Sequence, residues 1–180
     1  QTIKDMAYSI STRFEGQVAF YSLLPIPQGA AHGYETFSKA FKAKAMKALG
    51  RINIYEVSRG SAKVLIPDHK FPEIRWDDAT RGENPETMTS MEIAAKFQLL
   101  DNQRNQQKRE VCRHCFQTGE RGIIFGVSFF YEGGPLWPAD VPKVGADAEA
   151  GCVGCGWYDI AAWREGLIDA LDASTATGQV

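Results

Sequence analysis

The chain has 180 residues, of which 44% are hydrophobic and 23% charged, and its formal net charge is −2. These values are ordinary for one globular domain with its own core, and they argue against a uniformly basic protein that coats nucleic acid. No apolar run reaches the roughly 18–20 residues that a membrane-spanning helix needs, and the N-terminus lacks the apolar stretch of a secretory signal. We therefore expect a cytoplasmic protein without a membrane partner.

Charge is distributed unevenly along the chain. Residues 39–63 carry seven Lys or Arg and one acidic residue, whereas residues 123–180 carry two Lys or Arg and eight acidic residues. Such segregation steers a polyanion toward one face of a protein. The alternative is a lysine-rich helix face that is simply solvated.

The predicted elements of the first half mix strands and helices. The apolar stretch 17–25, ended by Pro25 and Pro27, predicts a buried strand. The stretch 33–49 predicts a helix, because Phe37, Phe41 and Ala45 fall on one stripe and Gly50 follows as a cap. Further along we expect strands at 51–57 and 62–66, the second ended by Pro67, and then a polar loop at 77–90.

The second half begins with a short apolar run at 96–100, which leads into a predicted helix at 102–111. A strand is expected at 122–132, and a loop rich in glycine and proline at 133–151. An amphipathic helix is predicted at 159–172, because Trp163, Leu167 and Leu171 share one stripe.

The four cysteines form two Cys-x-x-Cys pairs, Cys112 with Cys115 and Cys152 with Cys155, and 36 residues separate the pairs. Each such turn directs two thiolates at one point, and two turns complete a tetrahedral zinc shell. A shell of four thiolates has no open position, so the predicted zinc is structural. It would clamp the helix at 102–111 to the start of the C-terminal helix.

Three alternatives to this zinc site stay open. His114 is available as a zinc ligand in place of one cysteine. We expect it instead at an exposed position on the turn between Cys112 and Cys115. Disulfides are disfavoured because the chain lacks a secretory signal. A thioredoxin-type redox pair would not need a second copy.

An ordered set of motifs lies within residues 64–108. Asp68-His69-Lys70-Phe71-Pro72 follows a predicted strand, Phe97-Gln98-Leu99-Leu100 forms the next apolar run, and Arg104-Asn105-Gln106-Gln107-Lys108 lies in the helix after it. This order resembles the pattern of His-Asn-His (ββα-metal) nucleases. In that family an Asp-His pair on a first strand precedes a proline, a second strand is of the type Asn-Leu-Gln-Leu-Leu, and Asn-x-x-Lys opens a helix.

The sequence departs from the family pattern at several positions. Lys96 stands where the family has its middle Asn, and Asp101 and Arg104 replace the two cysteines that often flank the turn. The loop between His69 and the second strand is also long.

The resemblance implies an α+β fold with a ββα-metal (HNH) core and a structural zinc site of four cysteines. The core would span residues 61–111. Before it, residues 1–60 would form an N-terminal α/β segment with a basic helix for DNA contact or dimerisation. After it, residues 112–172 would form the zinc-clamped lobe, and residues 173–180 a tail.

The resemblance also implies a metal-dependent endonuclease that hydrolyses DNA phosphodiester bonds. His69 would be the base that activates water, and Asp68 and Asn105 would bind one Mg²⁺ or Mn²⁺ through their side-chain oxygens. Lys108, one helical turn beyond Asn105, would neutralise the phosphate. Adjacent strand residues point to opposite faces, so either the backbone twists after Pro67 or one residue of the Asp-His pair is structural. Taken singly, each residue has an ordinary explanation, as a turn cap, a surface histidine or an exposed helix residue.

Within the family, a compact chain with its own N-terminal segment and a zinc lobe most resembles a type II restriction endonuclease of a prokaryotic type. Such an enzyme would cut a short site in double-stranded DNA as a homodimer. The candidate DNA-binding residues are Gln103, Arg104, Gln107, Arg109, Lys39 and Lys42. The alternatives are a non-catalytic zinc-ribbon module that binds DNA or a protein, and an HNH nuclease that nicks DNA or cuts branched DNA.

Overall fold

The computed structural model describes residues 37–61 and 64–175 with their side chains, residue 176 by its backbone, and four strands before residue 37 by their backbones. The chain divides into two units, Gln1–Thr36 and Phe37–Val180. In the first unit β1 (Thr2–Ile3) pairs antiparallel with β2 (Met6–Ala7), and β3 (Ser9–Glu15) with β4 (Val18–Leu24). The strand predicted at 17–25 is present as β4, while its predicted burial lies outside what the structure describes.

The second unit begins with α1 (Lys39–Ala48), for which Ser38 is the N-cap because its Oγ accepts a hydrogen bond of 3.0 Å from the Phe41 amide. Gly50 follows the helix with a φ of +63°, as the cap predicted from sequence requires. The predicted start at residues 33–36 lies outside the described residues.

The single strand predicted at 51–57 is wrong. Two short strands, β5 (Ile52–Asn53) and β6 (Ser58–Arg59), form a hairpin there instead. The chain reverses because the Asn53 side chain accepts a hydrogen bond of 3.1 Å from the Tyr55 amide, and because Val57 has a positive φ of 55°.

A second hairpin lies at the centre of this unit. In it β7 (Leu65–His69) pairs antiparallel with β8 (Phe97–Asp101). The predicted end of the first strand at Pro67 is wrong, because β7 continues through this proline to His69. Within the described residues this sheet has two strands, so Pro67 lies on an edge strand, where a missing N–H group is tolerated.

The region between these two strands contains more structure than the predicted polar loop. Three short 3₁₀ turns, Glu73–Arg75, Thr80–Gly82 and Pro85–Thr87, are followed by α2 (Ser90–Lys96), which runs directly into β8. A capping box between Thr89 and Glu92 starts α2.

The helix that follows β8 is longer than predicted. α3 (Asn102–Thr118) begins at the N-cap Asp101, whose carboxylate accepts a hydrogen bond of 2.9 Å from the Arg104 amide. It ends only at Gly119, where φ is +82°, instead of at residue 111. The first cysteine pair therefore lies within the last two turns of α3.

The strand predicted at 122–132 is also wrong. Among the described residues, this segment makes one isolated bridge, Ile124 with Val127, and a second bridge, Glu120 with Leu136, flanks it. A tight turn with positive φ at Phe125 (54°) and Gly126 (73°) interrupts the apolar run.

The loop predicted at 133–151 is present, and it ends in a 3₁₀ segment at Ala146–Gly151. After it comes α4 (Ile160–Ala176), which continues past the predicted end at residue 172, so part of the predicted tail is helical. The last residues, 177–180, lie outside the described part of the chain.

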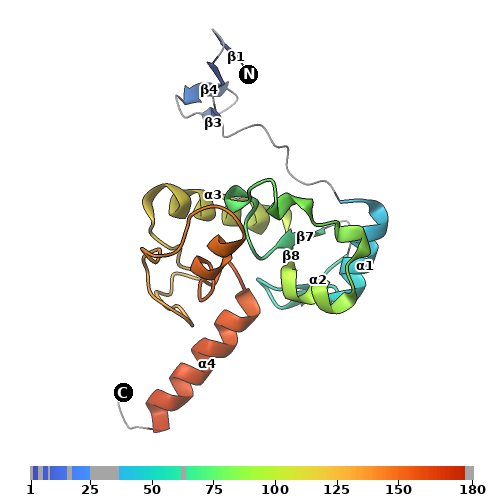
Figure 1. Ribbon diagram of the computed structural model, residues 1–180, viewed down its shortest axis with the longest axis vertical. Coiled ribbons are helices and arrows are strands. Elements are labelled where there is room, and N and C mark those ends of the chain that lie inside the picture. Colours follow the sequence, from blue (N-terminus) through green and yellow to red (C-terminus); the bar gives the residue numbers. More distant parts are fainter. Residues whose placement is uncertain are drawn as a thin grey trace. The chain divides into compact units, whose positions relative to one another are not determined.

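The second unit is an α+β structure in which the β7–β8 hairpin lies between two sets of helices and loops (Figure 1). On one face, Phe97 packs with Phe41, Ala45 and Ile93 of the two helices α1 and α2. On the other face, α3 contacts both strands. There Leu100 of β8 belongs to an apolar cluster with Ile124, Trp157, Ile160 and Trp163 of the C-terminal lobe.

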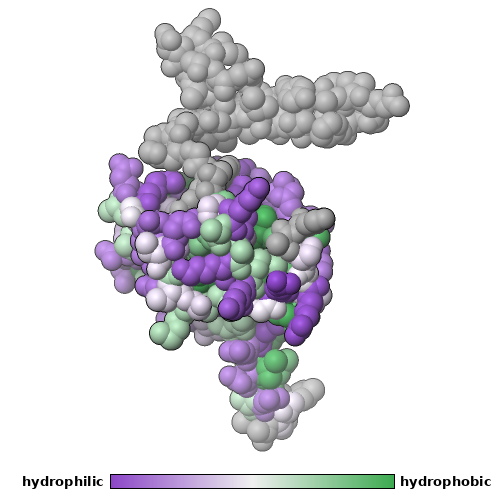
Figure 2. Space-filling view, turned by 90° about the vertical axis from the view of Figure 1, so that its right-hand side faces the viewer, coloured by the Kyte–Doolittle hydropathy of each residue, from purple (hydrophilic) through white to green (hydrophobic). Residues whose placement is uncertain are grey.

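The far half of α4 extends away from the body of this unit (Figure 1). Trp163 and Leu167 of the predicted stripe pack in the core as expected, but Leu171 is 56% exposed because the helix has left the body by then. In Figure 2 apolar and hydrophilic residues are interspersed on the face shown, and apolar side chains lie on the protruding helix as well. None of the helices in the described part is long and apolar enough to cross a membrane.

Candidate active site and cysteine cluster

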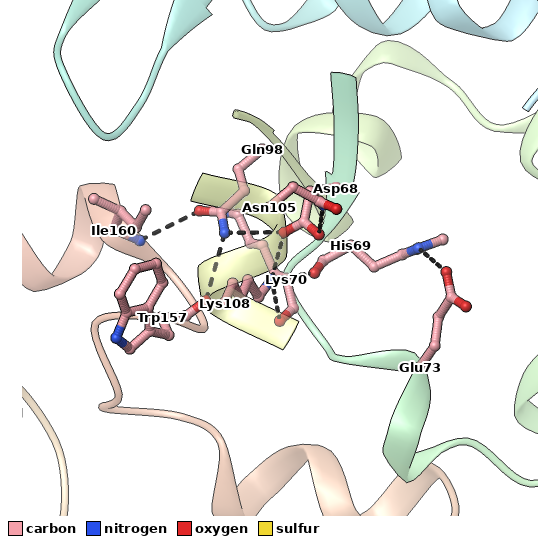
Figure 3. Close-up of polar contacts among 9 residues, drawn as sticks. All are labelled: Asp68, His69, Lys70, Glu73, Gln98, Asn105, Lys108, Trp157 and Ile160. Atoms are coloured by element: carbon pink, nitrogen blue, oxygen red, sulfur yellow. Dashed lines mark hydrogen bonds and ion pairs between the residues drawn. The ribbon is translucent and has the colours of Figure 1, made fainter. Parts of the chain in front are cut away.

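The register of the central hairpin places Asp68 and His69 on opposite faces. Asp68 lies across from Gln98, and His69 lies across from Phe97. Since side chains alternate along a strand, Asp68 points toward α3 while His69 points toward α1. Figure 3 shows the two side chains leaving β7 in different directions. The twist after Pro67 that would bring both to one face is not observed.

Asp68 is the centre of a buried polar cluster (Figure 3). Asn105 Nδ2 donates to Asp68 Oδ1 at 2.7 Å, and Lys108 Nζ donates to Asp68 Oδ2 at 2.5 Å. The Asp68 side chain is 12% exposed, whereas Asn105 is 5% exposed. Asn105 and Lys108 lie three residues apart on α3, so both reach the same side of the strand. The structure thus brings together three of the four residues that the sequence motif joins.

Lys108 is held more firmly than a phosphate-binding lysine would be. Besides Asp68, its ammonium donates to the backbone carbonyls of His69 and Lys70, the latter at 3.2 Å. These three acceptors match the three protons of the ammonium, and only 2% of the side chain is exposed. The contact with a phosphate expected from the sequence does not fit this burial. Lys108 instead fixes the Asp68 carboxylate to the end of β7.

His69 lies among aromatic rings on the opposite face. Its ring centroid is 4.3 Å from that of Phe97, 5.3 Å from that of Phe37, and 4.5 Å from that of Trp76, whose ring is nearly perpendicular. Nδ1 lies 3.7 Å from Glu73 Oε1, and 11% of the side chain is exposed. These neighbours leave little of the imidazole exposed.

Sequence reasoning did not identify Glu73 or Gln98. Glu73 is four residues after His69, a spacing that signals contact only within a helix, and the chain turns at Pro72 instead. Gln98 was counted only as part of a strand motif, although the period of two puts it on the face of Asp68.

The Asp68–Asn105 pair has the chemistry of a site for a hard cation. Asn105 presents its amide nitrogen to Asp68, and a rotation of the amide would place its oxygen there instead, 2.7 Å from Asp68 Oδ1. Neighbouring oxygens around Mg²⁺ are about 3.0 Å apart when each lies about 2.1 Å from the ion. Among residues 37–61 and 64–176, no group of three or more His, Cys, Asp or Glu is arranged to hold a metal. An ion at Asp68 would therefore need waters and substrate to complete its shell.

The four cysteines, which form no disulfide, line one small cavity of about 20 Å³. Cys112 and Cys115 come from α3, and Cys152 and Cys155 come from the turn that follows the 3₁₀ segment. Burial raises the pKa of the Cys152 thiol to about 12, against the opposing effect of Arg75, and it raises the pKa of Cys112 and Cys155 too. Cys115 and Cys152 are buried and Cys112 and Cys155 are half-buried, and thiolates are donors that zinc prefers, although no three of these cysteines are arranged to hold a metal ion in the described residues. His114 is not among the residues that line the cavity, and its side chain is 60% exposed.

The hairpin and the C-terminal lobe are joined beside Asp68 by Gln98 (Figure 3). Its Nε2 lies 3.4 Å from Asp68 Oδ2 and 3.5 Å from the Trp157 carbonyl, and its Oε1 accepts from the Ile160 amide at 3.5 Å. Lys70, two residues beyond Asp68, forms an ion pair of 2.7 Å with Asp159. The lobe that carries the second cysteine pair therefore supports the Asp68 cluster directly.

The candidate DNA-binding residues differ in how exposed their side chains are. Lys39, Lys42, Gln103 and Gln107 are exposed, whereas Arg109 is half-buried. Arg104 is half-buried as well, since its guanidinium lies 4.3 Å from the ring centre of Tyr55 and donates to Gln107 at 2.9 Å.

Comparisons of the chain with protein-family models, with curated proteins and with solved structures find no match.

Proposed function

We propose that the chain is a metal-dependent endonuclease that hydrolyses DNA phosphodiester bonds, with β7, β8 and α3 as a ββα-metal core. The observation that carries the proposal is the contact of Asn105 with Asp68 at 2.7 Å, next to a histidine on the same edge strand. The Asp-His and Asn-x-x-Lys motifs are 36 residues apart in the sequence, counted from His69 to Asn105. Their meeting in space is what a shared site requires.

The opposite directions of Asp68 and His69 suit hydrolysis of a phosphodiester. In an in-line displacement, the attacking water and the leaving oxygen lie on opposite sides of the phosphorus. A phosphate across the free edge of β7 would have His69 on one side and the Asp68–Asn105 pair on the other. His69 would take the proton of the attacking water. A divalent cation bound by Asp68 and Asn105 would neutralise the charge that develops on the phosphate and the leaving oxygen.

Three further side chains would keep these groups in place. Glu73 faces Nδ1 of His69 and would stabilise the imidazolium that forms when Nε2 takes the proton. Lys108 and Gln98 hold the Asp68 carboxylate toward α3. All three are positioning residues, because each acts through His69 or Asp68.

The cysteine cluster would bind one structural Zn²⁺, a proposal supported by the four cysteines that line one cavity. We further propose a type II restriction endonuclease that acts on double-stranded DNA as a homodimer. The exposed Gln103 and Gln107 of α3 are the candidates for reading bases, together with Arg104 and Arg109. The exposed Lys39 and Lys42 of α1 are candidates for phosphate contacts.

The experiment is digestion of a supercoiled plasmid with and without Mg²⁺, by the wild type and by His69→Ala. We expect discrete fragments from the wild type with Mg²⁺ and none in the other reactions. His114→Ala is the matched control, because this histidine is exposed and lies outside the cavity and the Asp68 cluster. Cleavage that survives His69→Ala at the wild-type rate would overturn the mechanism.

A non-catalytic zinc module is the second candidate, and one observation favours it. Asp68 already has partners in Asn105, Lys108 and Gln98, as a purely structural carboxylate would. Such a module would bind DNA or a protein without cutting DNA under any metal condition. Binding of a DNA duplex by wild type with no cleavage in Mg²⁺ or Mn²⁺ would select it.

A further inference from the structure

Two buried arginines flank the cysteine cluster. Arg75 is 1% exposed and Arg121 is 6% exposed, and both line the same cavity as the four sulfurs. Arginine is seldom buried this deeply unless its charge is compensated. The contacts of the two guanidiniums therefore indicate the sign of the charge that the cavity accommodates.

Arg75 contacts sulfur, a carbonyl and an aromatic ring. Its Nη2 donates to Cys115 Sγ at 3.2 Å, and its Nη1 donates to the Lys143 carbonyl at 3.2 Å. The guanidinium carbon lies 3.5 Å from the ring centre of Trp137. Within the described part of the chain, no carboxylate forms an ion pair with Arg75.

Arg121 contacts only backbone carbonyls and a ring. Its Nη1 donates to the carbonyls of Glu132 and Gly134 at 3.1 and 3.0 Å, and its Nη2 donates to those of Cys152 and Val153. Its Nε is buried without a hydrogen-bond partner. Here too, none of the carboxylates in residues 37–61 and 64–175 forms an ion pair with the guanidinium.

The charge state of the sulfurs decides whether this arrangement is favourable. Neutral thiols or disulfides would leave the two buried positive charges with only carbonyl dipoles and aromatic rings around them and no negative counter-charge, which is a costly arrangement for buried ions. Four thiolates around a divalent cation carry two net negative charges, and two guanidiniums balance them. An N–H donor aimed at a ligating sulfur also stabilises the thiolate form.

We infer that Arg75 and Arg121 are the counter-charges of a tetrathiolate zinc site, and that they set its affinity for Zn²⁺. The inference rests on the zinc site of the proposed function and is independent of the nuclease activity. It also separates the alternatives for the cysteines, because neither disulfides nor a thiol redox pair would supply the two negative charges.

The test is the zinc affinity of the purified full chain, measured by competition with a chromophoric chelator. Arg75→Met and Arg121→Met remove a charge while keeping a long side chain, and Arg59→Met is the control because Arg59 is exposed on β6. We expect the first two to weaken zinc binding about 10–100-fold each and the control to leave it unchanged. Zinc affinities within twofold of the wild type for both variants would overturn the inference. A wild type that binds no zinc would overturn it along with the zinc site, whatever the outcome of DNA digestion.

A second pair of variants covers the case in which the methionine variants do not fold. Arg75→Lys keeps the charge, and Arg75→Gln keeps an N–H donor without the charge. Zinc affinity retained by Arg75→Lys but reduced in Arg75→Gln supports a counter-charge. Equal affinities in these two variants contradict it.

Discussion

Asn105 donates a hydrogen bond of 2.7 Å to the carboxylate of Asp68 and so joins α3 to β7 (Figure 3). The sequence motif required these two residues to meet, although they come from different elements. His69, the neighbour of Asp68, points to the other face of the hairpin. The proposed site therefore has a cation-binding side and a base-bearing side, separated by the backbone of one edge strand.

Asn105→Ala removes one proposed ligand of the divalent ion. We expect DNA cleavage to fall at least about 100-fold, the scale seen when one electrostatic contact of an active site is lost. Gel quantification of plasmid cleavage over a range of Mg²⁺ concentrations measures the effect. Asn102→Ala is the control, since Asn102 is exposed in the first turn of the same helix. Equal activities of the two variants would remove Asn105 from the site.

Lys108→Met leaves the Asp68 carboxylate without its cation in a mostly buried place. Loss of one partner of a buried ion pair costs about 3–5 kcal/mol, so we expect a decrease of this size in the free energy of unfolding, measured by urea denaturation. Arg113→Met, which breaks the exposed pair with Glu110, should cost less than about 1 kcal/mol. A Lys108→Met variant as stable as Arg113→Met would show that the Asp68–Lys108 pair is not structural.

Gln98→Ala removes the side chain that links Asp68 to the C-terminal lobe. We expect the Mg²⁺ concentration for half-maximal cleavage to rise severalfold while the zinc content stays at the wild-type level, because Gln98 contacts Asp68 and the lobe backbone but none of the four cysteines. Gln117→Ala, at an exposed position of α3, is the control. An unchanged Mg²⁺ dependence, or a loss of zinc in Gln98→Ala, would contradict this role.

Removal of zinc should affect more than the cysteine lobe. Arg75, which donates to Cys115, ends the 3₁₀ turn that begins with Glu73, the neighbour of His69. A chelator strong enough to strip zinc should therefore unfold the C-terminal half and abolish cleavage, and Mg²⁺ alone should not restore it. Near-ultraviolet circular dichroism follows the buried Trp157 and Trp163. Elemental analysis should give about one zinc per chain before treatment. A near-ultraviolet circular dichroism signal that stays unchanged after zinc has been removed would refute the structural role of the zinc site.

Local signals in the sequence predicted the parts that depend on short-range order. Asn105 and Lys108 lie on one side of α3 because three residues span about one helical turn. The alternation of a strand was enough to raise the conflict between Asp68 and His69, and the unbroken β7 resolves it in favour of opposite faces.

Features that depend on tertiary contacts could not be predicted in the same way. The run at 122–132 has the composition of a strand, yet its carbonyls accept from Trp157 Nε1 and Trp163 Nε1 instead of from a partner strand. The burial of Lys108 and Arg75 depends on which segments fold over them, which no local pattern encodes.

The most direct test of the account is the position of the divalent cation in crystals of the protein soaked with Mn²⁺. Anomalous scattering should give a peak in contact with Asp68 and Asn105, on the α3 side of β7. Mn²⁺ bound elsewhere, with no peak at this pair under conditions in which Mn²⁺ supports cleavage, would contradict the account.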